Sequence, residues 1–231
     1  MTSNPNLTDT TRTRLLLSCG LIVGPLFVLA FLIEGATRDG YNPLRHPISS
    51  LSIGDSGWMQ IANFVVTGSL TLAFAVGLRR TPRPVGGSVW VPRLVGLVGV
   101  GLIGAGFFVT DLVYGYPTDA PLALAQFSIH GRLHSLFSTP VFVGLPAVCF
   151  VFAHRFAASG ERGWVAYSVF TALAMLATFV LAGAGFTQFP GFRGIAGVLQ
   201  RSSLIIGFAW ITLLAARMST PGMHTVHVVV Q

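Results

Sequence analysis

The chain has 231 residues, of which 52% are hydrophobic and only 9% are charged, and its mean hydropathy is +0.72. Soluble domains carry about 25% charged residues, and disordered chains are poor in apolar residues, so both classes are excluded. A membrane protein with several spans remains. The formal net charge of +7 comes from 14 basic residues, all of them arginines, which stand singly or in small groups between apolar runs. That distribution is typical of loops that orient membrane helices and argues against nucleic acid as a partner.

Six apolar segments are long enough to cross about 30 Å of hydrocarbon as helices. In chain order they cover residues 15–33, 58–78, 94–110, 129–153, 164–186 and 194–216. We therefore expect an all-α fold, a polytopic bundle of six transmembrane helices over residues 14–217. Residues 1–13 are expected to form a cytoplasmic N-terminal tail. Residues 218–231 are expected to be a disordered C-terminal tail, in which His224 and His227 bind no metal.

The arginines predict which way the spans face. If the N-terminus is cytoplasmic, the cytoplasmic side holds Arg12, Arg14, Arg79, Arg80, Arg83, Arg93, Arg155, Arg162 and Arg217. The other side then holds Arg38, Arg45, Arg132, Arg193 and Arg201. Because cytoplasmic loops carry an excess of basic residues, we expect both termini to be cytoplasmic. The expected location is the cell membrane, as a multi-pass protein.

Small residues and prolines predict how the helices pack. The third span carries a run of glycines from Gly96 to Gly106, which allows a neighbouring helix backbone to approach closely. Pro25, Pro140 and Pro146 are expected to kink the first and fourth spans, because proline removes a helical hydrogen bond.

Polar residues are concentrated in one half of the membrane. At or near the predicted outer ends of the spans lie Glu34, Asn63, Asp111, His130, His134, Gln200 and Arg201. The inner halves contain hydroxyl side chains but no carboxylate, histidine or arginine at depth. A pore would need polar groups through the whole thickness, so this pattern favours a pocket that opens to the extracytoplasmic face.

The loop from Arg38 to Gly57 is predicted to belong to this pocket. Apolar residues repeat in it at helical spacing, and polar residues repeat one position later: Leu44, Ile48 and Leu51, then Arg45, Ser49 and Ser52. A short interfacial helix would bury the first set and present the second. Such a helix would act either as a lid over the pocket or as an anchor of the loop.

The leading hypothesis is the recognition of an amphipathic or lipid-like molecule. The expected pocket consists of Glu34, Arg45, His46, Asn63, Asp111, His134, Gln200 and Arg201. In this hypothesis Arg45 and Arg201 bind an anionic head group, and His46, Asn63 and Gln200 complete the ligand-binding set. The expected partners are the bilayer lipids and a lipid-like small molecule.

The first alternative is a membrane-embedded enzyme that acts on a lipid or isoprenoid. Glu34, Asp111 and His134 are the candidate catalytic residues, since a desolvated carboxyl group can act as a general acid that starts a cyclisation. His130 and His134, with Asp111 and His46, are candidate metal ligands that would activate water for hydrolysis. The segment HGRLH lacks the glutamate of a zincin motif, so the sequence favours no metal, and it favours no cofactor.

The second alternative is a structural or assembly role. Glu34 and Asp111 would then only form ion pairs with Arg201, Arg132 or Arg45. The ligand, any reaction and the oligomeric state stay open at this point.

Several stretches together resemble one family. They are GATRDGYNPLRHPISSLSIG (residues 35–54), GWMQIANFVVTG (57–68), the FVTD that ends at Asp111, GRLH (131–134) and GVLQR (197–201). Over residues 15–217 the chain is similar to the prokaryotic multi-pass membrane proteins of the domain of unknown function 998 family, most specifically around RHPISSLS. The resemblance implies a helical membrane bundle and no established activity. Its motifs coincide with the polar residues of the expected pocket.

Overall fold

The computed structural model describes residues 5–81, 89–122 and 126–219. Its elements are α1 (Pro5–Thr37), the 3₁₀ turn η1 (Ile48–Ser52), α2 (Gly57–Arg80), α3 (Trp90–Phe107), α4 (Ile129–Thr139), the π-helical turn η2 (Pro140–Gly144), α5 (Leu145–Ala158), α6 (Arg162–Phe186) and α7 (Ala196–Ser219). Because α4, η2 and α5 form one continuous span, there are six helical segments long and apolar enough to cross a membrane. The described residues contain no strand beyond an isolated bridge. The expected all-α fold with six spans is confirmed.

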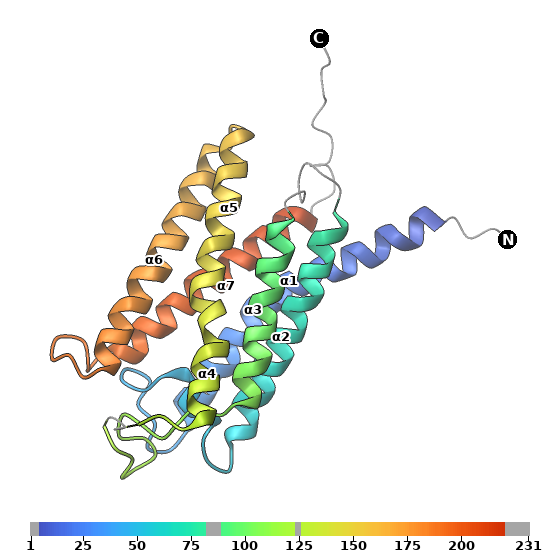
Figure 1. Cartoon of the computed structure of the whole chain (residues 1–231). Helices are drawn as coiled ribbons and strands as arrows, with labels where there is room; N and C mark the ends of the chain where they lie inside the picture. Colours follow the sequence, from blue (N-terminus) through green and yellow to red (C-terminus); the bar gives the residue numbers. More distant parts are fainter. Residues whose placement is uncertain (1–4, 82–88, 123–125, 220–231) are drawn as a thin grey trace.

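The spans run up and down as a bundle, so that α1 begins and α7 ends at the same end (Figure 1). We call this the terminal end. The opposite end, which we call the loop end, carries three longer loops, residues 38–56, 108–128 and 187–195. Which end faces the cytoplasm stays the prediction made from the arginines.

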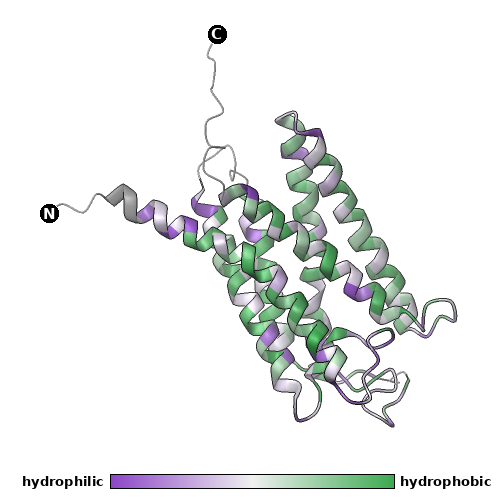
Figure 2. Cartoon of the chain, turned by 180° about the vertical axis from the view of Figure 1, so that it is seen from behind, coloured by the Kyte–Doolittle hydropathy of each residue, from purple (hydrophilic) through white to green (hydrophobic). Residues whose placement is uncertain are grey.

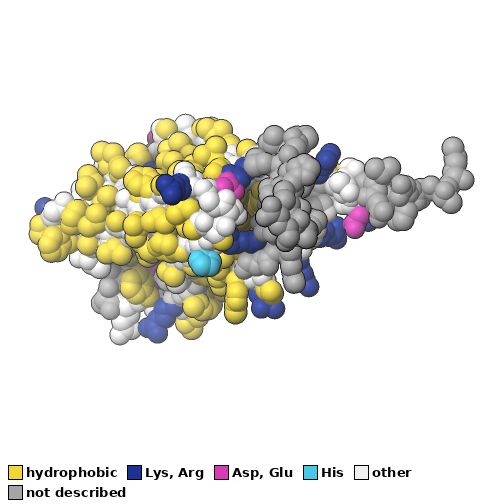
Figure 3. All heavy atoms as spheres, turned by 90° about the horizontal axis from the view of Figure 1, so that it is seen from above, with side chains coloured by type: hydrophobic (Ala, Val, Ile, Leu, Met, Phe, Trp, Pro, Cys, Tyr) yellow, Lys and Arg dark blue, Asp and Glu magenta, His cyan; other side chains and the backbone are white. Residues whose placement is uncertain are grey.

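The surface suits a bilayer around the helices and water at their ends. Hydrophobic residues dominate the helices along their length (Figure 2). Figure 3 looks onto the terminal end, where arginine side chains stand among the hydrophobic ones. One of them, Arg217, forms an ion pair with Glu161 and lies 5.1 Å from the ring centres of both Phe156 and Trp164. This pair ties the end of α7 to the start of α6.

Two glycines let α2 and α3 touch backbone to backbone. A methyl group on Gly68 would lie 2.7 Å from the carbonyl oxygen of Gly99, and one on Gly99 would lie 2.8 Å from the carbonyl oxygen of Gly68. The close approach expected of the third span therefore occurs against α2.

The fourth span changes its helix type at Pro140. This proline has no backbone N–H and its ring would collide with the carbonyl group four residues earlier in a regular α-helix. The chain accommodates it with the π-helical turn of η2, which contains one extra residue per turn. Below this turn α4 packs against α3, whereas above it α5 packs against α6. The fourth span therefore changes partners along its length.

The loop between α1 and α2 differs from its expected form. Its helix, η1, begins only at Ile48, and Leu44 is 53% exposed instead of buried, while Ser52 is buried. Ile48 and Leu51 are buried as expected. Two carbonyl groups before it, those of Pro43 and His46, bind an arginine of α7, as described below, in place of a helical N–H.

The first and last helices extend into the segments that were expected to be tails. α1 already begins at Pro5, within the expected N-terminal tail, and α7 continues to Ser219. The rest of the expected C-terminal tail, with His224 and His227, lies outside the described residues.

The contact between α2 and α3 is testable. Gly99→Leu is expected to lower the free energy of unfolding by about 2 kcal/mol, because the two backbones must separate to admit the side chain. Thermal unfolding in detergent measures this loss. Gly183→Leu is the control, since a methyl group at Gly183 meets nothing within 4 Å. Equal losses in both variants would contradict the close approach.

Candidate functional site

Arg201, in the second turn of α7, is buried and holds the loop between α1 and α2. Its side chain is 6% exposed, and its Nη1 donates to the carbonyl oxygens of Pro43 (2.7 Å) and His46 (2.9 Å). Its Nη2 donates to the hydroxyl of Tyr41, which itself donates to the carbonyl oxygens of His46 and Pro47. Neither of the two ion pairs found within the described residues includes Arg201. Carbonyl oxygens and a hydroxyl, not a carboxylate, therefore bind both Nη atoms of this buried cation.

Arg38 binds the other half of the same loop. Its Nη1 donates to the carbonyl oxygen of Ile53 (3.1 Å) and its Nη2 to that of Ser56 (2.9 Å). Nη2 also lies 3.5 Å from Oε2 of Glu34, one helical turn earlier. Glu34 thus pairs with Arg38, a partner that sequence reasoning did not consider for it.

The first turns of α7 contact this loop in two further ways. The backbone N–H of Gly197 donates to the carbonyl oxygen of Leu44 (2.8 Å), and Oε1 of Gln200 accepts from the backbone N–H of Ile48 (2.9 Å). A methyl group on Gly197 would lie 2.6 Å from two loop carbonyl oxygens, so a glycine is required there. Four residues of the stretch GVLQR, namely Gly197, Val198, Gln200 and Arg201, therefore contact the loop that carries RHPISSLS.

His46 joins this loop to the loop between α3 and α4. It is buried, its Nδ1 accepts from the backbone N–H of Asn42 (2.9 Å), and its ring centre lies 5.3 Å from that of Tyr116. Because Nδ1 accepts, the proton of the neutral ring is on Nε2. Burial lowers the pKa of His46 below its ordinary value, and the positive charges of Arg45 and Arg201 lower it further.

Asp111 and Gly131 form the junction between α3 and α4. Oδ2 of Asp111 accepts from the backbone N–H of Ser128 (3.1 Å), the residue that caps the N-terminus of α4. A carboxylate is favourable there because the N-terminus of a helix carries partial positive charge. A methyl group on Gly131 would overlap this carboxylate, so the glycine makes room for Asp111.

His134 fixes α4 to the end of α3. Its Nδ1 lies 3.0 Å from the carbonyl oxygen of Ala105 and 2.7 Å from that of Phe108. Carbonyl oxygens only accept, so Nδ1 carries a proton, and in the neutral ring Nε2 is then an acceptor. Within the described residues, no group donates to this Nε2.

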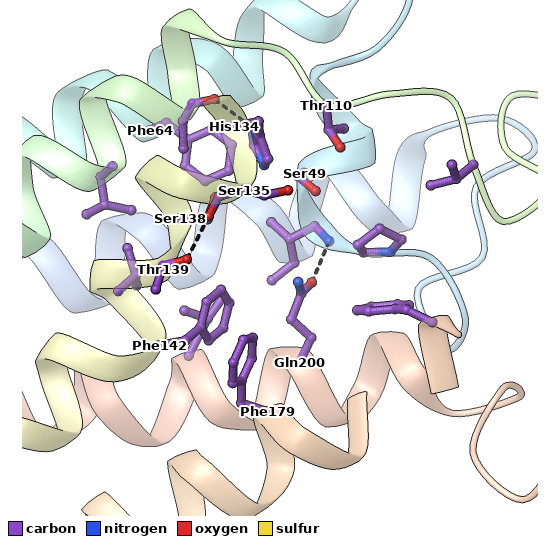
Figure 4. A pocket seen from close by; sticks show the side chains of 18 of the residues that line it. Ser49, Phe64, Thr110, His134, Ser135, Ser138, Thr139, Phe142, Phe179 and Gln200 are labelled. Carbon is purple, nitrogen blue, oxygen red and sulfur yellow. Dashed lines mark hydrogen bonds between the residues drawn. The ribbon is translucent and has the colours of Figure 1, made fainter. Parts of the chain in front are cut away.

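A cavity of about 300 Å³ lies at the loop end (Figure 4). It is situated between the loop that Arg201 and Gln200 hold and the junction between α3 and α4. All six spans contribute to its wall. Its aromatic residues are Phe27, Phe64, Tyr114, Phe127, Phe142, Phe179 and Phe186, and its polar residues are Ser49, Thr110, His134, Ser135, Ser138, Thr139 and Gln200. Phe27 lies ten residues before the end of α1, so the cavity reaches roughly 15 Å into the bundle.

The polar atoms of the cavity belong to uncharged side chains. Because Oε1 of Gln200 binds the backbone of η1, its Nε2 is left as a donor beside the cavity (Figure 4). The hydroxyls of Ser135 and Thr139 donate to carbonyl oxygens four residues earlier on their own helix (2.9 and 2.8 Å). Those of Ser49 and Ser138 have no partner among the described residues. The described lining contains no Asp, Glu, Lys or Arg.

The structure separates the expected site residues into two groups. His134 and Gln200 line the cavity. The others do not belong to its described lining: Glu34, Arg45, His46, Asn63, Asp111, His130 and Arg201. Most of these hold loops or helices together, and Arg45 and His130 are exposed. Asn63, for example, donates to the carbonyl oxygen of Phe27 (3.3 Å) and so binds α2 to α1.

The candidate metal ligands are not brought together. Across residues 5–81, 89–122 and 126–219, no three His, Cys, Asp or Glu side chains are placed to hold a metal ion. His46 and His134 use their Nδ1 atoms on the protein backbone, and the ring of His130 lies 5.8 Å from that of Phe108.

Sequence reasoning missed part of the cavity wall. Ser135, Ser138 and Thr139 follow His134 at spacings that place them on one side of α4, a signal that the sequence did contain. Phe142 and Phe179 stack with ring centres 4.3 Å apart, but they come from different spans, and no local pattern predicts that they meet.

The role of Arg201 is testable by substitution. Arg201→Met is expected to lower the free energy of unfolding by roughly 3 kcal/mol, because several buried carbonyl oxygens lose their donor. Backbone hydrogen exchange over residues 41–48 should also become faster. Arg45→Met, in the same loop but exposed, is the control and should leave both quantities unchanged. Unchanged exchange in Arg201→Met would contradict the anchoring role.

The loop is also expected to loosen at acidic pH. The pKa of His46 is lower in the folded chain than in the unfolded chain. Neutral His46 therefore stabilises the docked loop fully above the unfolded pKa of about 6.5, and this stabilisation is lost as the pH falls through the folded pKa. Tyr41 does not titrate in this range, because burial raises its pKa to about 12. Exchange over residues 41–48, corrected for intrinsic rates, should rise between about pH 7.5 and 5, and His46→Gln should abolish that rise.

Comparison with known proteins gives one family. No curated protein and no solved structure matches the chain significantly. The family described as "Protein of unknown function (DUF998)" matches residues 21–217, from the first span to the last. The match includes Arg201, the loop that it holds, the junction between α3 and α4, and the cavity. It confirms the resemblance seen in the motifs. The chain belongs to the DUF998 family of proteins of unknown function.

Proposed function

We propose that this membrane protein binds an amphipathic, lipid-like molecule in the cavity at its loop end. The observation that carries the proposal is the composition of the wall: apolar and aromatic side chains from all six spans surround the space, and a few neutral polar groups lie among them. Small-molecule sites commonly combine an apolar wall with a small number of placed polar groups. We assign the polar end of the ligand to His134 and Gln200. They replace Arg45 and Arg201, the head-group residues expected from the sequence.

The charged residues support this proposal indirectly. Arg38 and Arg201 fix the loop that places Ile48 and Ser49 against the cavity. Anchoring of this kind gives a binding site a defined shape before the ligand arrives. With the terminal end in the cytoplasm, as the arginines predict, the cavity lies in the extracytoplasmic half of the membrane.

The enzyme alternative has less support. Its two candidate acids lie outside the described lining, since Glu34 pairs with Arg38 and Asp111 binds the start of α4. We therefore propose binding and no reaction.

Filling the cavity tests the proposal. In wild-type protein extracted in mild detergent, native mass spectrometry is expected to detect a retained adduct of lipid mass. Ser138→Trp should abolish it, because the indole occupies the space that the ligand needs. Ser69→Trp, at an exposed serine on the outer side of α2, is the matched control and should keep the adduct. Loss of the adduct in both variants, or in neither, would refute binding in this cavity.

A further inference from the structure

The cavity contains no ionised side chain in its described lining, and this limits what it can hold. We infer, on the basis of the proposed function, that it is selective for an uncharged membrane lipid whose polar end donates to His134 and accepts from Gln200. The inference names the chemical class of the ligand and therefore goes beyond the binding of an amphipathic molecule in general.

Three charged residues of the loop end have partners outside the cavity. Arg201 donates to loop carbonyl oxygens, Asp111 accepts from Ser128, and Glu34 pairs with Arg38. A phosphate or carboxylate entering the cavity would lose its water without gaining an opposite charge, which is strongly unfavourable. An uncharged hydroxyl or amide loses far less, because two hydrogen bonds replace those it made with water.

The two polar partners have fixed hydrogen-bonding roles. Nδ1 of His134 must carry a proton because it faces carbonyl oxygens, so Nε2 accepts. Oε1 of Gln200 must face the backbone N–H of Ile48, so Nε2 donates. Figure 4 shows these two side chains reaching toward the cavity from α4 and α7. A group that both donates and accepts, such as a hydroxyl, matches this pair better than a pure acceptor such as a phosphate ester oxygen.

The size of the cavity points to a lipid of the bilayer as the source. A volume of about 300 Å³ is at the lower limit for small-molecule sites, so it holds the polar end and only the first part of an acyl chain. α4 packs on α3, while α6 packs on α5 and α7, and both α4 and α6 line the cavity. Ser135 and Thr139 are exposed on this side. The rest of the lipid's acyl chain can therefore lie between α4 and α6, in contact with the bilayer.

The direct test compares two lipids that differ only in a phosphate. Detergent-solubilised wild-type protein is titrated with 1,2-dioleoylglycerol and, separately, with dioleoyl phosphatidic acid, and binding is measured by native mass spectrometry and by the shift of the thermal midpoint. We expect dioleoylglycerol to bind at least about tenfold more tightly, the ratio for a single unmatched polar interaction. Equal or tighter binding of phosphatidic acid would overturn the inference while leaving the proposed function intact.

Two conservative variants test the assigned atoms. Gln200→Glu keeps an acceptor for Ile48 but, as a carboxylate, has no donor, and His134→Asn keeps a donor for the end of α3 but is too short to place an acceptor where Nε2 of the imidazole lies. Each should weaken dioleoylglycerol binding about tenfold, measured in protein that still shows a cooperative thermal unfolding transition. Gln188→Glu, in the loop after α6, is the matched control and should bind as wild type does.

The outcomes separate the two proposals. If dioleoylglycerol binds wild type and both variants equally well, the assignment of His134 and Gln200 is wrong. If neither lipid binds and Ser138→Trp changes no adduct, the proposed function itself fails, and the inference fails with it.

Discussion

The loop end depends on the burial of one guanidinium group against backbone carbonyl oxygens. Arg201 lies 155 residues along the chain from His46, whose carbonyl it binds. A buried cation needs acceptors for its donors, and here the carbonyl oxygens of Pro43 and His46 accept from Nη1 while the hydroxyl of Tyr41 accepts from Nη2. The arrangement benefits both partners, because the carbonyl groups would otherwise also be buried without donors. Since carbonyl groups do not ionise, the contact does not depend on the protonation of a carboxylate.

The position of the cavity follows from this contact and from the contact that His134 of α4 makes with the end of α3. Arg201 and Gln200 fix the segment that carries Ile48 and Ser49, and these two residues form one side of the cavity. On the other side, His134 binds the free carbonyl groups at the end of α3, which a helix end always leaves unpaired. Side chains that are hydrogen-bonded to backbone groups thus position both sides of the cavity, and apolar residues line the space between these sides.

Local properties of the sequence were sufficient for the fold, but not for the site. The six spans follow from length and hydropathy, which each segment carries by itself, and distance along each helix places the polar residues at one end. The partners of those residues could not be predicted, because backbone carbonyl groups are identical at every position and give no signal. In the structural alternative Glu34 pairs with a distant arginine, whereas its partner in the structure is Arg38, four residues away. His134 and Gln200, two residues of the pocket expected from the sequence, line the cavity.

The π-helical turn of η2 sets the rotational phase between the two halves of the fourth span. An α-helix turns by about 100° per residue, so the extra residue rotates α4 against α5 by roughly that angle. The same span can thus keep α5 packed on α6 while α4 directs His134 and Ser138 toward the cavity. Removing one residue from this turn would rotate α4 by about 100° relative to α5 and would turn the cavity-lining side of α4 elsewhere. At this point Pro140 and the extra residue that accommodates it together determine where the polar groups of α4 lie.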